Sequence, residues 1–175
     1  TGWGFDQVFF INHHMDGGHV KALNKAIQKA RMEIGIGAFW IIDQFFAKRL
    51  GFKEDEPHLL IHRSLMASGP PPLNLSIHAE DHETSFMWHY LPDLVNLEVL
   101  KTLEPTNLAF DDLLVWAKGG IEARKITPQG YFGNPATASP ERGKKETETY
   151  GRTAAGVIEA FLKGHYCPPV RDDEH

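Results

Sequence analysis

Two short, continuous apolar runs near the start of the chain predict buried strands. They cover residues 8–11 and 38–42, and a run without polar alternation is typical of a strand that is covered on both faces. Between them, apolar residues recur at helical spacing over residues 19–34. Strand, helix and strand in this order indicate a parallel pair joined by a helical crossover.

The later patterns are less regular. We expect Asp43 to cap a short helix that ends at Gly51. Three further helices are predicted, around residues 62–66, 86–91 and 144–162. A strand is predicted within residues 115–125, and the Gly- and Pro-rich residues 129–143 predict a loop. The predicted fold class is therefore α/β, with three layers (α/β/α) and a largely parallel sheet.

The composition is that of an ordinary globular protein. Hydrophobic residues make up 42% of the 175 residues and charged residues 23%. A net charge of −5 without a basic stripe argues against a nucleic-acid partner, and no apolar run approaches the roughly 20 residues of a membrane span. A single cysteine, Cys167, excludes a disulfide framework, so we expect a reducing, cytoplasmic location.

A polar cluster directly follows the first predicted strand. It reads Asn12-His13-His14-Met15-Asp16, and open α/β sheets bind ligands at the carboxyl ends of their strands. Imidazole and carboxylate groups suit zinc, manganese or iron, so His14 and Asp16 are candidate metal ligands. A polar loop with hydrogen-bonded histidines is the alternative interpretation.

A second cluster, residues 78–85, precedes the helix predicted at 86–91. Its five ionisable side chains are His78, Glu80, Asp81, His82 and Glu83. Glu83 has an ordinary explanation, because a carboxylate is favourable near the positive end of a helix dipole. Helix capping explains His78 and Glu80 less readily, so these two are candidate catalytic residues.

A third cluster lies in the Gly-rich loop, which reads Gly130-Tyr131-Phe132-Gly133-Asn134-Pro135. Glycines let a backbone approach a ligand closely. Tyr131 and Phe132 are therefore candidate substrate-binding residues in a pocket for a flat or ring-shaped molecule. A plain turn with aromatic packing is the alternative.

The three clusters, in this order and spacing, resemble the creatininase family (creatinine amidohydrolases and their relatives). That family carries an Asn-Gly-His motif after a buried strand, a His-Ala-Gly motif that ends in Glu-Thr-Ser, and a Gly-x-x-Gly-x-Pro loop followed by a glutamate. The corresponding segments are Asn12-His13-His14, His78-Ala79 with Glu83-Thr84-Ser85, and Gly130 to Pro135 with Glu141. We interpret residues 1–164 as the carboxy-terminal portion of a single creatininase-like domain and residues 165–175 as a tail.

The resemblance implies metal-assisted hydrolysis of a small substrate. One or two divalent ions, zinc foremost and manganese or iron as alternatives, lower the pKa of a bound water. His14 and Asp16 are then metal ligands, and Glu83 matches a glutamate that contacts metal in some members. His78 matches the substrate-side histidine, which polarises or protonates the reacting group. His13 replaces the usual glycine, changes the pocket wall and is assigned to substrate binding.

The family's amino-terminal ligands, a Glu-x-His pair and an Asp, have no counterpart in this sequence. We therefore expect an amino-terminal segment or a second polypeptide to supply them, and a chain that starts Thr1-Gly2-Trp3 to be a processed or split product. Family members are often ring-shaped or hexameric, so we expect an oligomer.

Cleavage of a carbon–nitrogen bond in an amide, cyclic amide or formamide is the leading hypothesis for the function. One alternative is hydrolysis of a cyclic ketone or lactone, such as an inosose-type ring. The other is a non-catalytic, family-derived subunit with a binding or scaffolding role, motivated by the altered Asn12-His13-His14 motif and the absent front ligands.

Overall fold

The computed structural model describes residues 4–53, 55–63 and 75–169. The chain divides into two compact units, the first formed by residues 1–68 and 150–175 and the second by residues 69–149. Each unit is described by itself.

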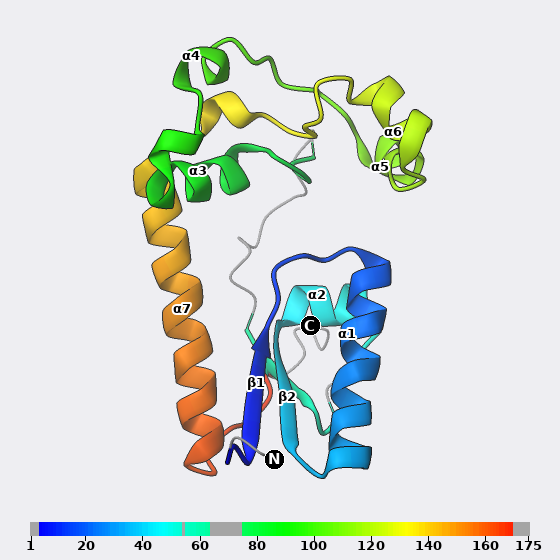
Figure 1. The fold of residues 1–175 in the computed structure, drawn as a ribbon, viewed down its shortest axis with the longest axis vertical. Coiled ribbons are helices and arrows are strands. Elements are labelled where there is room, and N and C mark those ends of the chain that lie inside the picture. Colours follow the sequence, from blue (N-terminus) through cyan, green and yellow to red (C-terminus); the bar gives the residue numbers. More distant parts are fainter. Residues whose placement is uncertain (1–3, 54, 64–74, 170–175) are drawn as a thin grey trace, which may run out of the picture. The chain divides into compact units, whose positions relative to one another are not determined.

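The first unit contains a three-stranded parallel sheet. Its strands are β1 (Gln7–Ile11), β2 (Gly37–Asp43) and β3 (Leu59–His62), in the order β1-β2-β3 (Figure 1). Trp40 on the central strand lies beside Phe10 on β1 and Leu59 on β3. The two predicted strands and their parallel pairing are therefore confirmed.

Helices cover both faces of this sheet. On one face are α1 (Gly17–Lys29), which continues as a π-helical turn (Ala30–Ile34), and α2 (Gln44–Arg49). On the other face lies the part of α7 (Pro140–Leu162) that belongs to the first unit. The predicted three-layer α/β/α arrangement is confirmed, and Asp43 caps α2 as expected, because its Oδ1 accepts a hydrogen bond from the Phe45 amide at 2.8 Å.

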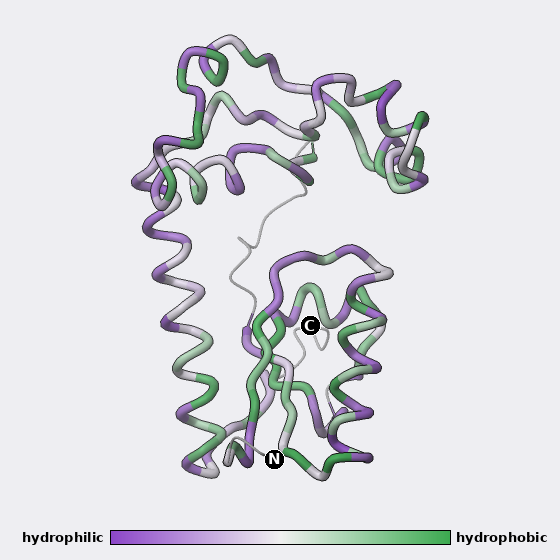
Figure 2. The backbone as a smooth tube through the Cα atoms, viewed as in Figure 1, coloured by the Kyte–Doolittle hydropathy of each residue, from purple (hydrophilic) through white to green (hydrophobic). Residues whose placement is uncertain are grey.

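The alternating side chains of β2 join the three layers. Ala38, Trp40 and Ile42 pack in one core with α1 and α2. Phe39 and Ile41 pack in a second core with Ala154, Val157 and other residues of α7. All five are nearly inaccessible to solvent, and each large apolar side chain buried in this way contributes roughly 1.5–3 kcal/mol. Figure 2 shows the hydrophobic colouring of much of this sheet's strands.

The second unit is mainly helical. Its elements are α3 (Asp81–Tyr90), a 3₁₀ turn (Pro92–Leu94), α4 (Leu97–Leu100), α5 (Phe110–Trp116), α6 (Gly120–Ile126), a second 3₁₀ turn (Pro135–Thr137) and the first turns of α7. The described residues of this unit form one isolated antiparallel bridge, between His78 and Phe132.

One secondary-structure prediction is wrong, and a second is contradicted at its first residue. Residues 115–125 form no strand, because α5 and α6 occupy this region; α5 starts where the Asp112 carboxylate accepts a hydrogen bond from the Ala109 amide at 2.8 Å. The short helix predicted around residues 62–66 is contradicted at its first residue, because β3 runs to His62 beside β2. Residues 64–66 lie outside the described part of the chain.

The helices α3 and α7 touch backbone to backbone in the second unit. A Cβ atom on Gly143 would overlap the carbonyl group of Ser85. Ser85 is fully buried, and its hydroxyl donates to the Asp81 carbonyl at 2.5 Å and accepts from the Ser139 amide at 2.9 Å. A glycine and a small hydroxyl residue are therefore both required at this crossing.

Among the described residues, no helix combines the length and the apolar character that crossing a membrane requires.

Gly143→Ala is expected to lower the free energy of unfolding by about 3 kcal/mol, because a rigid backbone carbonyl cannot yield to the added methyl group. Gly151→Ala is the matched control, since it lies on the same helix and its added Cβ would meet nothing within 4 Å. That variant is expected to gain about 0.5–1 kcal/mol from helix propensity. Urea denaturation measures both, and equal stability of the two variants would contradict the close crossing.

Candidate active site

The loop after β1 is held together by Asn12. The Asn12 amide donates to the His14 carbonyl at 2.7 Å, and its Oδ1 lies 3.0 Å from Nε2 of His19. The rings of His14 and His19 meet edge to face, 5.3 Å between centroids. Both imidazoles are exposed at the carboxyl end of the strand, where the sequence placed a metal site. The structure thus brings His19 into contact with His14.

Asp16, a predicted metal ligand, is also the N-cap of α1. Its Oδ1 accepts hydrogen bonds from the amides of Gly18 at 2.9 Å and His19 at 3.0 Å. The His19 amide is the main reason that the pKa of Asp16 lies below its ordinary value. Because both bonds end on Oδ1, capping leaves a charged carboxylate with a second oxygen that can bind a cation.

His13 has a different neighbour from His14. Its ring lies 5.3 Å from the ring of Tyr150, at 70°, so it packs against the part of α7 that belongs to the same unit. The assignment of His13 to substrate binding stays a prediction.

The side chains of the first cluster are of the types that bind a divalent metal, but they are too few to complete its coordination. Imidazole and carboxylate are appropriate ligands for zinc or manganese. A tetrahedral site takes four ligands, and within the described ranges no group of three or more His, Cys, Asp or Glu side chains could hold a metal ion. His14 and Asp16 therefore fit as part of a site that needs further ligands.

Glu80 caps α3 from a buried position. The residue is 5% exposed, and its two carboxylate oxygens accept from the amides of His82 at 2.7 Å and Glu83 at 3.1 Å. Gly133, at φ +145°, makes room for it, since a Cβ there would lie 2.5 Å from the Cβ of Glu80. Contrary to the sequence interpretation, capping explains Glu80 well, because both oxygens are used by the helix. Its catalytic assignment stays a prediction.

His78 and Glu83 form the most accessible ionisable pair of the second cluster. Nδ1 of His78 lies 3.6 Å from Oε2 of Glu83, and the side chains are 51% and 47% exposed. The same Oε2 accepts from the Ala79 amide at 2.6 Å. The backbone of His78 is fixed as well, because it exchanges two hydrogen bonds with Phe132, at 2.8 and 3.2 Å. The structure thus brings together an imidazole and a carboxylate that sequence reasoning assigned to different roles.

Trp116 is a neighbour of His78 that the sequence did not reveal. Its ring centroid lies 5.6 Å from that of His78 and 5.9 Å from that of Phe132. Its indole N–H donates to the Thr127 hydroxyl at 3.0 Å. The ring is therefore fixed beside the histidine while remaining partly exposed. No local pattern marks this contact, since the two residues lie on separate elements and Trp116 falls in the segment 115–125 that was predicted to contain a strand.

Tyr131 and Phe132, the predicted substrate-binding aromatics, lie in the interior of the second unit. Their exposed fractions are 7% and 0%. The Tyr131 hydroxyl donates to the Glu104 carbonyl at 2.5 Å, so its polar atom is satisfied within the protein. Aromatic packing, the alternative given above, accounts for both residues, and their contact with a substrate stays a prediction.

An ionic network fixes the first turn of α3 against α7. Arg142 pairs with the carboxylates of Asp81 and Glu146, the latter at 2.7 Å, and Glu146 also bonds to Nδ1 of His82. Burial opposes the charged form of Glu146, yet the hydrogen bonds from Arg142 and His82 outweigh it, and the pKa of Glu146 lies below its ordinary value. The network holds the segment that carries Glu83.

An α/β/α unit with imidazole and carboxylate groups after its first strand is typical of proteins that bind ligands at the carboxyl edge of a sheet. The family model described as "Creatininase: Creatinine amidohydrolase" matches residues 1–158. The chain therefore belongs to the creatininase family.

One solved structure that matches is provisionally described as a creatinine amidohydrolase from Bacteroides fragilis NCTC 9343. The sequence identity is 20% and the TM-score 0.41, over 82% of this chain. The chain spans 60% of the length of that protein. A search of curated proteins finds no match.

Glu146→Gln tests the ionic network through its pH dependence. A carboxyl group whose pKa is lowered by folding stabilises the protein above its ordinary pKa of 4.5, and this contribution is lost as pH falls through the lower, folded-state value. The variant is therefore expected to be less stable at pH 7 and to lose less stability between about pH 5 and pH 3. Thermal unfolding over this range measures the difference.

The control for this experiment is Glu148→Gln, which removes a more exposed carboxylate two residues further along α7. Parallel pH profiles for Glu146→Gln and the unaltered protein would show that the network contributes no pH-dependent stability.

Proposed function

We propose that this chain is part of a metal-dependent hydrolase that cleaves a carbon–nitrogen bond of a small amide, cyclic amide or formamide. The observation that carries the proposal is the pair formed by His78 and Glu83, 3.6 Å apart, half exposed and fixed by the backbone of the second unit. Membership of the creatininase family supports hydrolysis as the reaction class.

In this proposal His78 is the acid that serves the departing nitrogen. An amide nitrogen leaves readily only when it is protonated or hydrogen-bonded, and imidazole is the side chain most often used for this near neutral pH. The Glu83 carboxylate lies 3.6 Å from Nδ1 of His78, where it can help to orient the ring. Half exposure lets His78 exchange protons with water between turnovers.

Trp116 supplies a flat surface beside His78. Its N–H is directed to Thr127 and its ring is held against Phe132, so its position is set before a substrate arrives. Planar amides and heterocycles stack on such a face. We therefore assign Trp116, rather than the buried Tyr131 and Phe132, to the substrate-contacting surface.

A divalent metal, zinc foremost, would lower the pKa of a bound water and so generate hydroxide near neutral pH. His14 and Asp16 are the residues of the first unit that would hold it. Glu83, in the second unit, matches a glutamate that contacts metal in some family members, and this assignment stays a prediction. Because two donors are too few, we propose that an amino-terminal segment or second polypeptide supplies the others.

His78→Gln is expected to lower turnover about 10²- to 10⁴-fold, the usual contribution of a general acid. The measurement is hydrolysis of a panel of cyclic amides and heterocyclic formamides by the purified protein with any polypeptide that copurifies. His89→Gln, on the adjacent helix α3, is the control and should leave turnover unchanged. Full activity of His78→Gln on every hydrolysed substrate would remove His78 from the mechanism. Activity confined to inososes or lactones would favour the ketone or lactone alternative.

Asp16→Asn separates the two roles of this carboxylate. Asparagine caps a helix as well as aspartate does, so the unfolding temperature should stay within a few degrees, whereas metal content should fall to less than about half because the charged ligand is lost. Elemental analysis combined with denaturing mass spectrometry of the same sample measures the metal and any second polypeptide. Asp111→Asn, at an exposed position in the second unit, is the control.

The same experiment addresses a non-catalytic role. That alternative is favoured by one observation, the lack of a three-donor metal group among the described residues. A chain that purifies alone and without metal would support it. Unchanged metal content in Asp16→Asn would instead show that the metal binds elsewhere.

A further inference from the structure

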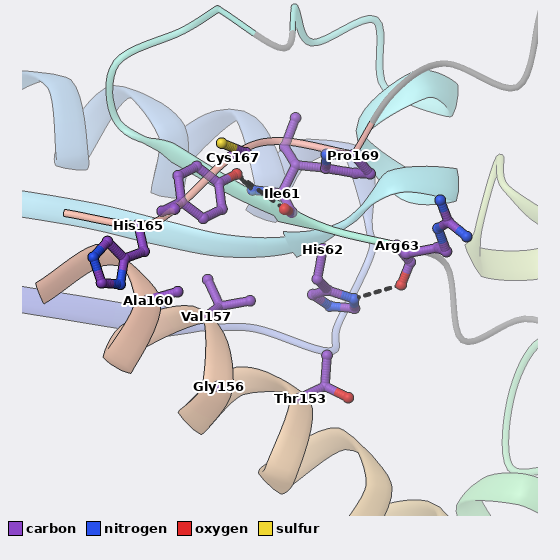
Figure 3. A pocket seen from close by; sticks show the side chains of 11 residues that line it. Ile61, His62, Arg63, Thr153, Gly156, Val157, Ala160, His165, Cys167 and Pro169 are labelled. Atoms are coloured by element: carbon purple, nitrogen blue, oxygen red, sulfur yellow. Dashed lines mark hydrogen bonds between the residues drawn. The ribbon is translucent and has the colours of Figure 1, made fainter. Parts of the chain in front are cut away.

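The first unit contains a groove between β3 and α7 that shares no residue with the candidate active site. Its volume is about 440 Å³, which lies within the range of small-molecule sites. Figure 3 shows Ile61, His62 and Arg63 along the strand, and Thr153, Gly156, Val157 and Ala160 along the helix. Residues 165–169 close one side.

The ionisable side chains that line the groove, apart from Tyr166 and Cys167, are all basic. They are His62, Arg63 and His165, and Figure 3 shows Arg63 and His165 toward opposite ends. Within the described part of the chain, no hydrogen bond or ion pair engages the Arg63 guanidinium or the His165 ring. A guanidinium is always charged and carries several N–H donors in one plane. The end of the groove at Arg63 can therefore bind an anion.

Asp43 is the acidic residue that faces this group of bases. Its Oδ2 lies 3.9 Å from Nδ1 of His62, while its Oδ1 caps α2. Nδ1 of His62 is also 2.9 Å from the Arg63 carbonyl. Asp43 therefore acts on His62, which leaves the positive charge of Arg63 for a ligand.

The rest of the groove is apolar, and hydrogen bonds hold one of its walls in place. Val157 and Ala160 line it from the helix. On the strand, the Ile61 side chain is buried in the core that contains α1 and α2, and the Ile61 amide and carbonyl form hydrogen bonds with the Tyr166 hydroxyl, at 2.6 and 2.9 Å. A Cβ on Gly156 would meet nothing within 4 Å. A glycine inside a helix lowers stability by about 1 kcal/mol relative to alanine. At position 156 no neighbouring atom would clash with a side chain, so packing does not explain the glycine.

We propose that this groove binds a small organic monocarboxylate, with Arg63 pairing with the carboxylate and the apolar body lying along Val157 and Ala160. One permanent cation matches one negative charge, and arginine engages a carboxylate with two parallel hydrogen bonds. An inorganic dianion would leave the apolar wall unused and half of its charge without a counterpart.

The test is titration of the full chain, with any copurifying polypeptide, by 3-phenylpropionate in a calorimeter. A dissociation constant of about 1 mM or below is expected for a ligand of this size. The neutral analogue 3-phenylpropionamide and inorganic phosphate should both bind at least about tenfold more weakly. Arg63→Gln should weaken binding of the carboxylate by about tenfold or more.

Gly156→Leu should abolish binding by filling the groove, without loss of thermal stability. Gly151→Leu is the matched control, because it adds the same side chain to the same helix at a position that is also open and lies outside the groove. It should bind 3-phenylpropionate within about twofold of the unaltered protein.

Three results would overturn the proposal. The first is that the unaltered protein does not bind the probe, or binds the carboxylate and the amide equally. The second is binding that survives Gly156→Leu but is lost in His14→Ala or His78→Gln, which would place the probe in the candidate active site. The third is binding that appears only after residues 171–175 are deleted, since this acidic end, Arg-Asp-Asp-Glu-His, would then be the natural occupant.

Discussion

The burial of β2 on both faces is the constraint on which the first unit depends. Trp40 and Ile42 point to one side of the sheet and Phe39 and Ile41 to the other, and all four are removed from solvent. A strand with two apolar faces requires a helical layer on each side. The crossover helices α1 and α2 supply one layer, and α7 supplies the other from a position about a hundred residues later in the chain. The groove at β3 exists because this edge strand and α7 meet without a further strand beside them among the described residues.

Carboxylates at helix starts connect the fold with the candidate chemistry. Asp16, Asp43 and Glu80 each accept hydrogen bonds from amides in the first turn of a helix, and for Asp16 these bonds lower the pKa of the carboxyl group. A metal ligand needs the charged form, so capping and ligation are compatible wherever one oxygen remains. Asp16 meets that condition, because a single oxygen carries both of its bonds. Glu80 does not, because the helix uses both oxygens of a buried group. Composition and spacing alone could not separate these two cases.

The sequence predicted the parts of the structure that local patterns determine. Continuous apolar runs identified β1 and β2, and helical spacing identified α1 and α7, because these elements bury faces that recur at a fixed period. It missed β3, a four-residue strand whose identity depends on pairing with β2. It also predicted a strand where α5 ends and α6 follows. Val115 and Trp116 lie in α5, a short helix whose start is fixed by the bond from the Ala109 amide to Asp112. Short elements depend on their neighbours more than on their own composition.

In the candidate site, too, the sequence identified the residues that belong to a local pattern and missed those that come from other elements. The sequence located His78 and Glu83 but could not find Trp116 or Arg142, because they reach the cluster from other elements. It also assigned Tyr131 and Phe132 to a pocket, although a Gly-rich loop packs inward as readily as it faces a ligand. In this protein Gly133 brings the loop against Glu80, so the glycine serves an internal contact rather than an external one.

The backbone at His78 distinguishes this residue from an ordinary surface histidine. The next residue, Ala79, has φ +46°, a conformation that costs about 1–2 kcal/mol for a residue with a side chain. It persists because the chain is held on both sides, by the bridge between His78 and Phe132 before it and by the bond from its own amide to Glu83 after it. The result is an imidazole on a fixed backbone whose ring is still half exposed. A histidine that only fills space needs neither a strained backbone nor exposure to solvent. A general acid needs a fixed position and a ring that a substrate can reach.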